Sequence, residues 1–270
     1  MNIPSSANKA FPCNGFYRRV LLDDVVPFWL KHAIDREYGG IGNVIDDEGN
    51  TISHDKYLWS QGRALWSFSA LFNRIEHNPE WLGFAHHIYR YISTHGRDEQ
   101  GRWMYRLDKD GNVLDRDISI YVDGFVMAGL GEYHVATGNE AALKLALETA
   151  KNVIERLKVP DGYGTAPYSI PDGMKVLGIR MLFSWVFFHL GKIAGRADLR
   201  DRGTAMAREI LDEFYIPEKN AALEYVSLDG EFVDTPWGRV CIPGHVIESL
   251  WFAIEIFEQT GEADRIQACC

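Results

Sequence analysis

The sequence contains little cysteine, and it has no long apolar run. Four cysteines occur among the 270 residues, and none of them has the paired spacing of a metal site. No apolar run approaches the roughly 20 residues that a membrane-spanning helix needs, and residues 1–14 lack the apolar segment of a signal peptide. We therefore expect a protein of the reducing cytoplasm that is neither secreted nor inserted into a membrane.

Basic residues are in the minority as well. The 28 lysines and arginines face 38 aspartates and glutamates, which gives a net charge of -10. This charge repels nucleic-acid phosphates and anionic lipid surfaces, so we expect neither nucleic acid nor membrane as a partner. No linker rich in proline or serine divides the chain, and 46% hydrophobic residues supply a substantial core. The composition therefore favours a single domain over residues 1–270.

Turn signals recur at a regular interval along the chain. Gly49, Gly111, Gly173 and Gly230 each lie in a turn-forming segment with aspartate, and their successive separations are 62, 62 and 57 residues. This period suits a unit of two helices and a short β-hairpin. Apolar residues at three- and four-residue spacing predict helices over residues 15–35, 55–77, 79–96, 117–137, 139–157, 174–194, 196–215 and 244–260. Short alternating runs around glycine predict hairpins over residues 40–52, 103–114 and 223–233.

These patterns predict an all-α domain of stacked helical hairpins, with the short β-hairpins gathered on one rim. A further helix begins near Glu262, and the chain stops at Cys270 before a partner helix could follow. Each unit of such an array buries the apolar face of its neighbour. We therefore expect an array that is incomplete at the C-terminus, with an exposed apolar surface on its last helix pair.

One predicted helix carries an aromatic and cationic face. Trp59, Arg63 and Trp66 follow one another at helical spacing, so two indoles flank a guanidinium on one side of the helix. Aromatic planes beside a forked donor suit a sugar, and a guanidinium suits the oxygens of an enediolate or a carboxylate. The alternative is a core helix whose arginine either snorkels to solvent or pairs with a carboxylate, because large aromatic residues usually serve the core.

A second motif combines a histidine with a carboxylate at the start of a helix. His245, Glu248 and Trp251 share one face, and the preceding Pro-Gly is typical of a helix entry. A carboxylate three residues on could orient the imidazole as a general base. The alternative is a packing or capping histidine, and a metal site is disfavoured because no second motif supplies further ligands. Asp123, among apolar helix neighbours, is either a site residue or a hydrogen-bonded structural acid.

Taken together, several segments resemble the N-acylglucosamine 2-epimerase family, which also includes cellobiose 2-epimerases and mannose-type aldose-ketose isomerases. The resemblance runs from about Val20 to Gly261. It rests on Phe28-Trp29-Leu30, Asp35-Arg36-Glu37-Tyr38-Gly39-Gly40, Lys56-Tyr57-Leu58-Trp59-Ser60-Gln61-Gly62-Arg63 and Pro243-Gly244-His245-Val246-Ile247-Glu248. It implies an (α/α)6 toroid of twelve helices with the site in its central cavity, of which this chain would supply about eight.

The resemblance also implies a reaction. A base removes the proton at C2 of a small open-chain sugar, an enediolate forms, and reprotonation gives the epimer or the ketose, without a metal or a cofactor. By this resemblance His245 is a catalytic base, Glu248 is its partner, and Arg63 stabilises the enediolate. The residues implied to contact the substrate are Trp59, Tyr121, Asp123, Met181 and Trp251.

Two departures from the family pattern matter. The second catalytic histidine of the family lies in the last third of its fold, beyond Cys270, so we expect this chain to be impaired. The disaccharide and mannose branches carry a histidine near the position of Arg180 and Met181, and this sequence is similar to the N-acylglucosamine type there. Two alternatives stay open, a glycoside hydrolase that pairs Asp123 with Glu248, and a non-catalytic binding protein. A homodimer would cover the exposed apolar surface.

Overall fold

A computed structural model describes residues 14–159 and 162–270 of the chain. The helices are α1 (Asn14–Arg19), α2 (Val26–His32), α3 (Leu58–Arg74), α4 (Pro79–His95), α5 (Tyr121–Thr137), α6 (Glu140–Arg156), α7 (Leu177–Ile193), α8 (Ala197–Glu209), α9 (Pro243–Thr260) and α10 (Ala263–Cys269). The strands are β1 (Val44–Ile45), β2 (Thr51–Ser53), β3 (Lys56–Tyr57), β4 (Arg106–Leu107), β5 (Val113–Asp115), β6 (Met174–Val176), β7 (Tyr215–Ile216), β8 (Ala221–Ala222) and β9 (Tyr225–Ser227). π-Helical stretches, 20–25 and 210–214, join α1 to α2 and extend α8.

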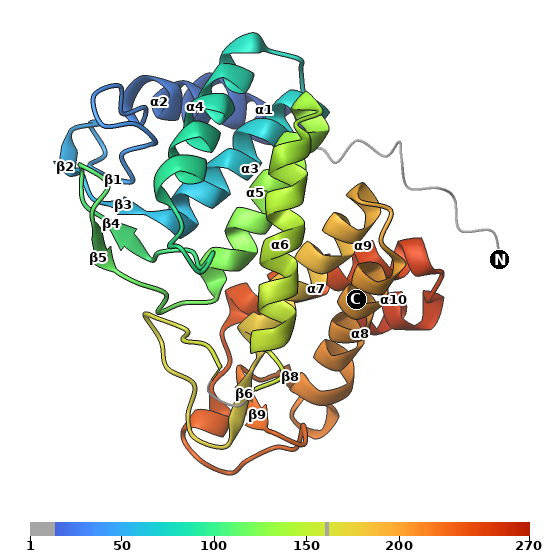
Figure 1. Ribbon diagram of the computed structural model, residues 1–270. Helices are drawn as coiled ribbons and strands as arrows, with labels where there is room; N and C mark the ends of the chain where they lie inside the picture. Colours follow the sequence, from blue (N-terminus) through green and yellow to red (C-terminus); the bar gives the residue numbers. More distant parts are fainter. Residues whose placement is uncertain (1–13, 160–161) are drawn as a thin grey trace.

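The long helices alternate between two layers (Figure 1). In one layer α3, α5, α7 and α9 each contact the next. In the other layer α4 packs on α3, α6 on α5, α8 on α7 and α10 on α9. The protein is therefore all-α with the packing of an α/α toroid, as the sequence predicts.

Local signals explain where the helices begin and end. The side chains of Asn78 and Asn139 accept hydrogen bonds from backbone N–H groups in the first turns of α4 and α6. Gly138 and Gly261 adopt left-handed conformations just after α5 and α9, which allows the chain to turn away. Seven of the eight predicted helices are confirmed, with ends moved by a few residues, and the predicted helix over 15–35 is divided by a π-helical stretch.

Two of the three predicted β-hairpins are confirmed, and the third is wrong. β1 pairs with β2, and β4 pairs with both β5 and β3. The predicted hairpin over residues 223–233 does not form, because β9 pairs instead with β6, with Met174 opposite Ser227 and Val176 opposite Tyr225. β3 and β6 run directly into α3 and α7. These strands therefore lie at the N-terminal ends of inner helices.

The inner helices α3 and α5 approach each other closely at two glycines. A Cβ atom added to Gly62 would lie 2.8 Å from the backbone of Phe125 and Val126, and one added to Gly129 would lie 2.6 Å from the carbonyl oxygen of Gly62. Backbones can come this near only without side chains between them. The close contact brings side chains of α3 and α5 side by side in one continuous surface.

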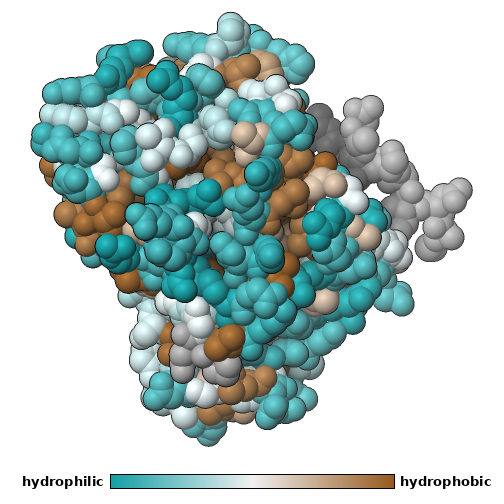
Figure 2. Space-filling model, in the orientation of Figure 1, coloured by the Kyte–Doolittle hydropathy of each residue, from teal (hydrophilic) through white to brown (hydrophobic). Residues whose placement is uncertain are grey.

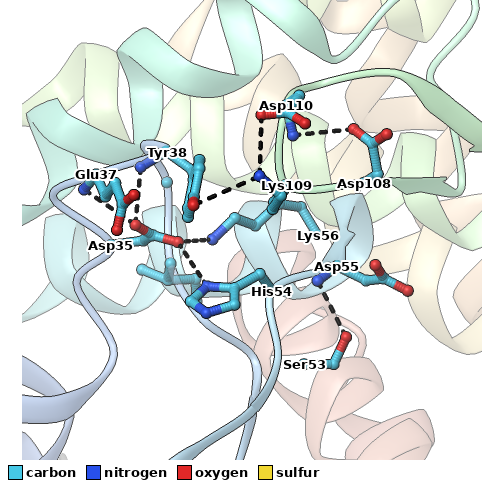
Figure 3. Close-up of polar contacts among 12 residues, drawn as sticks. Asp35, Glu37, Tyr38, Ser53, His54, Asp55, Lys56, Asp108, Lys109 and Asp110 are labelled. Atoms are coloured by element: carbon cyan, nitrogen blue, oxygen red, sulfur yellow. Dashed lines mark hydrogen bonds and ion pairs between the residues drawn. The ribbon is translucent and has the colours of Figure 1, made fainter.

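A buried ion pair ties the segment after α2 to the start of α3. Lys56 is fully buried, and its Nζ lies 2.5 Å from Oδ2 of Asp35 (Figure 3). The other oxygen of Asp35 accepts hydrogen bonds from the backbone N–H groups of Glu37 and Tyr38. Burial lowers the pKa of Lys56, and the carboxylate of Asp35 opposes that effect. The pair fixes the rim of the fold.

Most of the face in Figure 2 is hydrophilic, with hydrophobic residues gathered in its middle. On α9 the side chains of Ile247 and Trp251, one turn apart, are 70% and 58% exposed. These two side chains are exposed apolar groups on α9, and the contiguous apolar surface expected on the last helix pair stays a prediction. Within 14–159 and 162–270, no helix is both long enough and apolar enough to cross a bilayer.

Candidate active site

A cavity of about 740 Å³ opens on the inner face of the helical arc. All four inner helices line it, together with the segment 165–170 between α6 and β6. Its walls are mainly aromatic and aliphatic, and a few polar groups reach into it. This volume and this mixture are typical of a site for a small molecule.

The predicted face of α3 turns toward this cavity. Trp59, Arg63 and Trp66 all line it. The guanidinium of Arg63 stacks over the ring of Phe125 at 4.5 Å, and it has no carboxylate partner in the part of the chain that the structure describes. The alternative of an arginine paired with a carboxylate inside a core helix is therefore wrong. Trp66 packs edge-to-face against Trp185 and closes the floor of the cavity.

His245 reaches the same cavity from the first turn of α9, but its partner differs from the one expected. Nδ1 of His245 lies 2.8 Å from Oε2 of Glu224, which belongs to the segment between β8 and β9. Glu248 also lines the cavity, although it makes no hydrogen bond to the imidazole. The expectation that Glu248 orients the ring is wrong, since a carboxylate from another segment already occupies Nδ1.

The Glu224 carboxylate controls the charge of the imidazole. Its hydrogen bond raises the pKa of His245, burial opposes this, and the nearby charge of Glu248 adds to the rise. The imidazole is 37% exposed, whereas the side chain of Glu224 is 3% exposed. Both residues line the cavity, and the imidazole is the more accessible of the two.

Three further predicted residues line the cavity. Tyr121 of α5, Met181 of α7 and Trp251 of α9 do so. Burial raises the pKa of Tyr121, and the charge of Glu224 adds to that rise. The Tyr121 hydroxyl lies so close to α7 that a Cβ atom on Gly178 would come within 2.7 Å of it. These side chains bring three inner helices to one surface.

Asp123 is not among the residues that line the cavity, contrary to its predicted role as a substrate contact. Its carboxylate is buried and forms an ion pair with Arg156 of α6 at 3.2 Å, and Arg156 also binds Asp117 at 2.8 Å. Burial raises the pKa of Asp123, Arg156 opposes part of this rise, and the resulting pKa is about 7. Asp123 is therefore the hydrogen-bonded structural acid of the alternative interpretation, and it cannot face Glu248 as the second carboxylate of a hydrolase.

The sequence of residues 39–269 matches the family model described as N-acylglucosamine 2-epimerase. The chain belongs to this family. It is 27% identical to the N-acylglucosamine 2-epimerase of Bos taurus over 90% of its own length, and 32% identical to the cellobiose 2-epimerase of Dictyoglomus turgidum over 53%. The chain spans 59% of the bovine relative and 37% of the bacterial one.

Solved structures support the fold of this N-acylglucosamine 2-epimerase family member. A sugar epimerase from a ruminal bacterium is similar with a TM-score of 0.82 and 22% identity, over 94% of this chain and 68% of that one. A D-mannose isomerase is similar with a TM-score of 0.78 and 16% identity, over 99% and 70%. Both likenesses bear on the fold alone, and they agree with the two layers of helices.

Sequence reasoning missed two parts of the cavity in this family member. Glu224 stands in an apolar run, Leu223-Glu224-Tyr225, and a lone carboxylate in such a run was the only signal for it. The segment 165–170 carries Tyr168, an exposed ring at the cavity wall. Ser119 holds this segment by donating a hydrogen bond to the carbonyl oxygen of Ala166 at 2.8 Å. No periodic pattern marks it.

Proposed function

We propose that this chain carries catalytic residues of a sugar epimerase or isomerase that transfers a proton at C2 of an open-chain aldose. The observation that carries the proposal is the joint presence of His245 and Arg63 in one cavity. Nε2 of His245 has no hydrogen-bond partner, and the Arg63 guanidinium no carboxylate partner, within the described ranges. A free base and a free cation suit a reaction that removes a proton and creates an oxyanion.

The proposed step uses each group at a stated atom. Nε2 of His245 takes the proton from C2, and the C–H electron pair becomes the C1–C2 double bond. The carbonyl electrons move onto O1, where Arg63 stabilises the negative charge. Return of a proton to C2 gives an aldose, and return to C1, together with transfer of the O2 proton to O1, gives a ketose. Trp59, Tyr121 and Trp251 would pack on the apolar faces of the sugar.

Only one histidine serves the cavity, since His245 is the sole histidine among the described residues that line it. A single base can take a proton and return it to the same face of the enediolate, whereas inversion at C2 needs a donor on the opposite face. We therefore propose that this chain exchanges the C2 proton with solvent faster than it inverts C2. Substrate identity is part of the test, and N-acylhexosamines are favoured because the sequence near Arg180 and Met181 resembles the N-acylglucosamine type.

The test is proton exchange at C2 in D2O, followed by NMR. N-acetylglucosamine, N-acetylmannosamine, glucose, mannose and cellobiose are incubated separately with the parent chain, His245→Ala and Arg63→Met. His77→Ala is the matched control, because His77 is exposed and stacks on Phe72 away from the cavity. Loss of exchange in the first two variants but not in the control is expected. If none of the five sugars exchanged its C2 proton, the proposal would be refuted. If a sugar bound without exchanging, a binding protein would be favoured.

We also propose a cytoplasmic location, a role in carbohydrate metabolism and assembly as a homodimer. Free thiols at Cys241, Cys269 and Cys270 support a reducing compartment. The exposed Ile247 on α9 supports contact with a second copy. Cell fractionation tests the location. Sedimentation velocity of the parent and of Ile247→Glu tests the dimer, which the acidic side chain should dissociate.

A further inference from the structure

Glu224 is held in place from two sides before it meets His245. Its backbone N–H donates to the carbonyl oxygen of Val240 at 2.8 Å, and its own carbonyl accepts from the N–H of Leu177 at 2.8 Å. Leu177 is the first residue of α7, and Val240 lies shortly before α9. The carboxylate therefore projects from a backbone that is fixed to the entries of two inner helices.

The bond between the two side chains decides which imidazole nitrogen carries the proton. A carboxylate only accepts hydrogen bonds, so Nδ1 of neutral His245 must donate to Glu224. The lone pair of the neutral ring then lies on Nε2. Since Nδ1 is engaged with the buried carboxylate, Nε2 is the nitrogen left to act as a base.

We propose that Glu224 is a positioning residue that fixes the tautomer and orientation of His245, so that Nε2 acts as the base at C2 of the sugar. This inference rests on the proposed function. Glu224 does not take the proton. After transfer, its charge stabilises the imidazolium, in the manner of the buried aspartate of a catalytic triad. Glu248, on the same helix as His245, contributes charge but does not select the tautomer.

Other titratable or charged groups line the same cavity. Glu248 reaches the cavity from α9, Tyr121 from α5, Arg63 from α3, and Tyr225 follows Glu224 in the chain. The two tyrosines are neutral near pH 7, because burial raises the pKa of each phenol. The negative charges near His245 are thus Glu224 and Glu248, and only Glu224 makes a hydrogen bond to it.

The experiment is 15N NMR of the full chain with labelled histidine, because ring 15N shifts report both tautomer and pKa. In the parent we expect the Nδ1–H tautomer and a raised pKa. Glu224→Gln removes the charge and should lower the pKa, and Glu224→Ala removes the acceptor and should shift the ring toward the Nε2–H tautomer. Glu248→Gln is the comparison, with a smaller fall in pKa and the parent tautomer.

Exchange at C2 supplies a second readout. We expect Glu224→Ala to lower kcat about 100-fold with little change in KM, since a base in the wrong tautomer loses most general-base catalysis. Glu224→Asp keeps the charge and should recover part of the rate. A tautomer and pKa unchanged in Glu224→Gln and Glu224→Ala would overturn the positioning role. If the NMR responses occur but the parent exchanges no sugar, the proposed function fails while the pairing of the two side chains stands.

Discussion

The close contact between α3 and α5 gives a sharp prediction for Gly62→Ala. A Cβ atom at this position would lie 2.8 Å from backbone atoms of Phe125 and Val126. Because the obstacle is backbone and not the end of a flexible side chain, relief requires the two helices to move apart. That movement would also shift Arg63, which neighbours Gly62 and stacks on Phe125.

The size of the effect follows from two opposing contributions. Overpacking a tight contact costs about 3 kcal/mol at the upper end of its usual range. Alanine is about 1 kcal/mol better than glycine inside a helix, which offsets part of this loss. We expect Gly62→Ala to lower the free energy of unfolding by about 2 kcal/mol, equivalent to a fall in Tm of about 6 °C for a chain of this size.

Gly83→Ala is the matched control for this experiment. Gly83 also lies inside a long helix, α4, but a Cβ atom there would meet nothing within 4 Å. The same substitution should therefore stabilise the protein by about 0.5–1 kcal/mol. Urea and thermal unfolding of both variants measure the two values. If Gly62→Ala proved as stable as the parent, or Gly83→Ala were equally destabilising, the steric argument would be refuted.

The buried ion pair, the buried carboxylate and the cavity loop each give a further prediction. Lys56→Met removes the buried cation that pairs with Asp35 and should reduce stability in urea by about 3 kcal/mol. Adding Asp35→Asn should restore part of this loss, and an unchanged unfolding midpoint in Lys56→Met would contradict the argument. The pKa of Asp123 is raised from 3.8 to about 7. The stability that protonated Asp123 contributes is therefore present below pH 3.8 and is lost as pH rises through 7. Asp123→Asn should gain stability relative to the parent across that window, and a difference in unfolding free energy that did not change with pH would exclude this account. Tyr168→Ala should raise KM about fivefold, equivalent to about 1 kcal/mol of stacking, at constant kcat; a fall in kcat alone would count against a role in binding.

The helices of this protein could be predicted from its sequence because their signals are local. Apolar spacing marks the helix face that packs. An asparagine marks the beginning of α6, and a glycine marks the end of α5. The cavity face of α3 could be predicted in the same way, since Trp59 and Arg63 lie four residues apart on one helix. Asp123 could not, because a carboxylate among apolar neighbours looks the same whether it faces a cavity or Arg156.

The wrong hairpin and the wrong partner of His245 have one physical cause. Alternating residues indicate a strand but do not specify its partner, and β9 pairs with β6 across about 50 residues of chain. This register sets the positions of residues 224 and 225, since Val176 lies opposite Tyr225 and the N–H of Leu177 donates to the carbonyl oxygen of Glu224. The same long-range pairing thus removes the local hairpin and carries Glu224 to the imidazole. A histidine can therefore be placed in the cavity correctly from the sequence, while the group that orients it is set by the sheet.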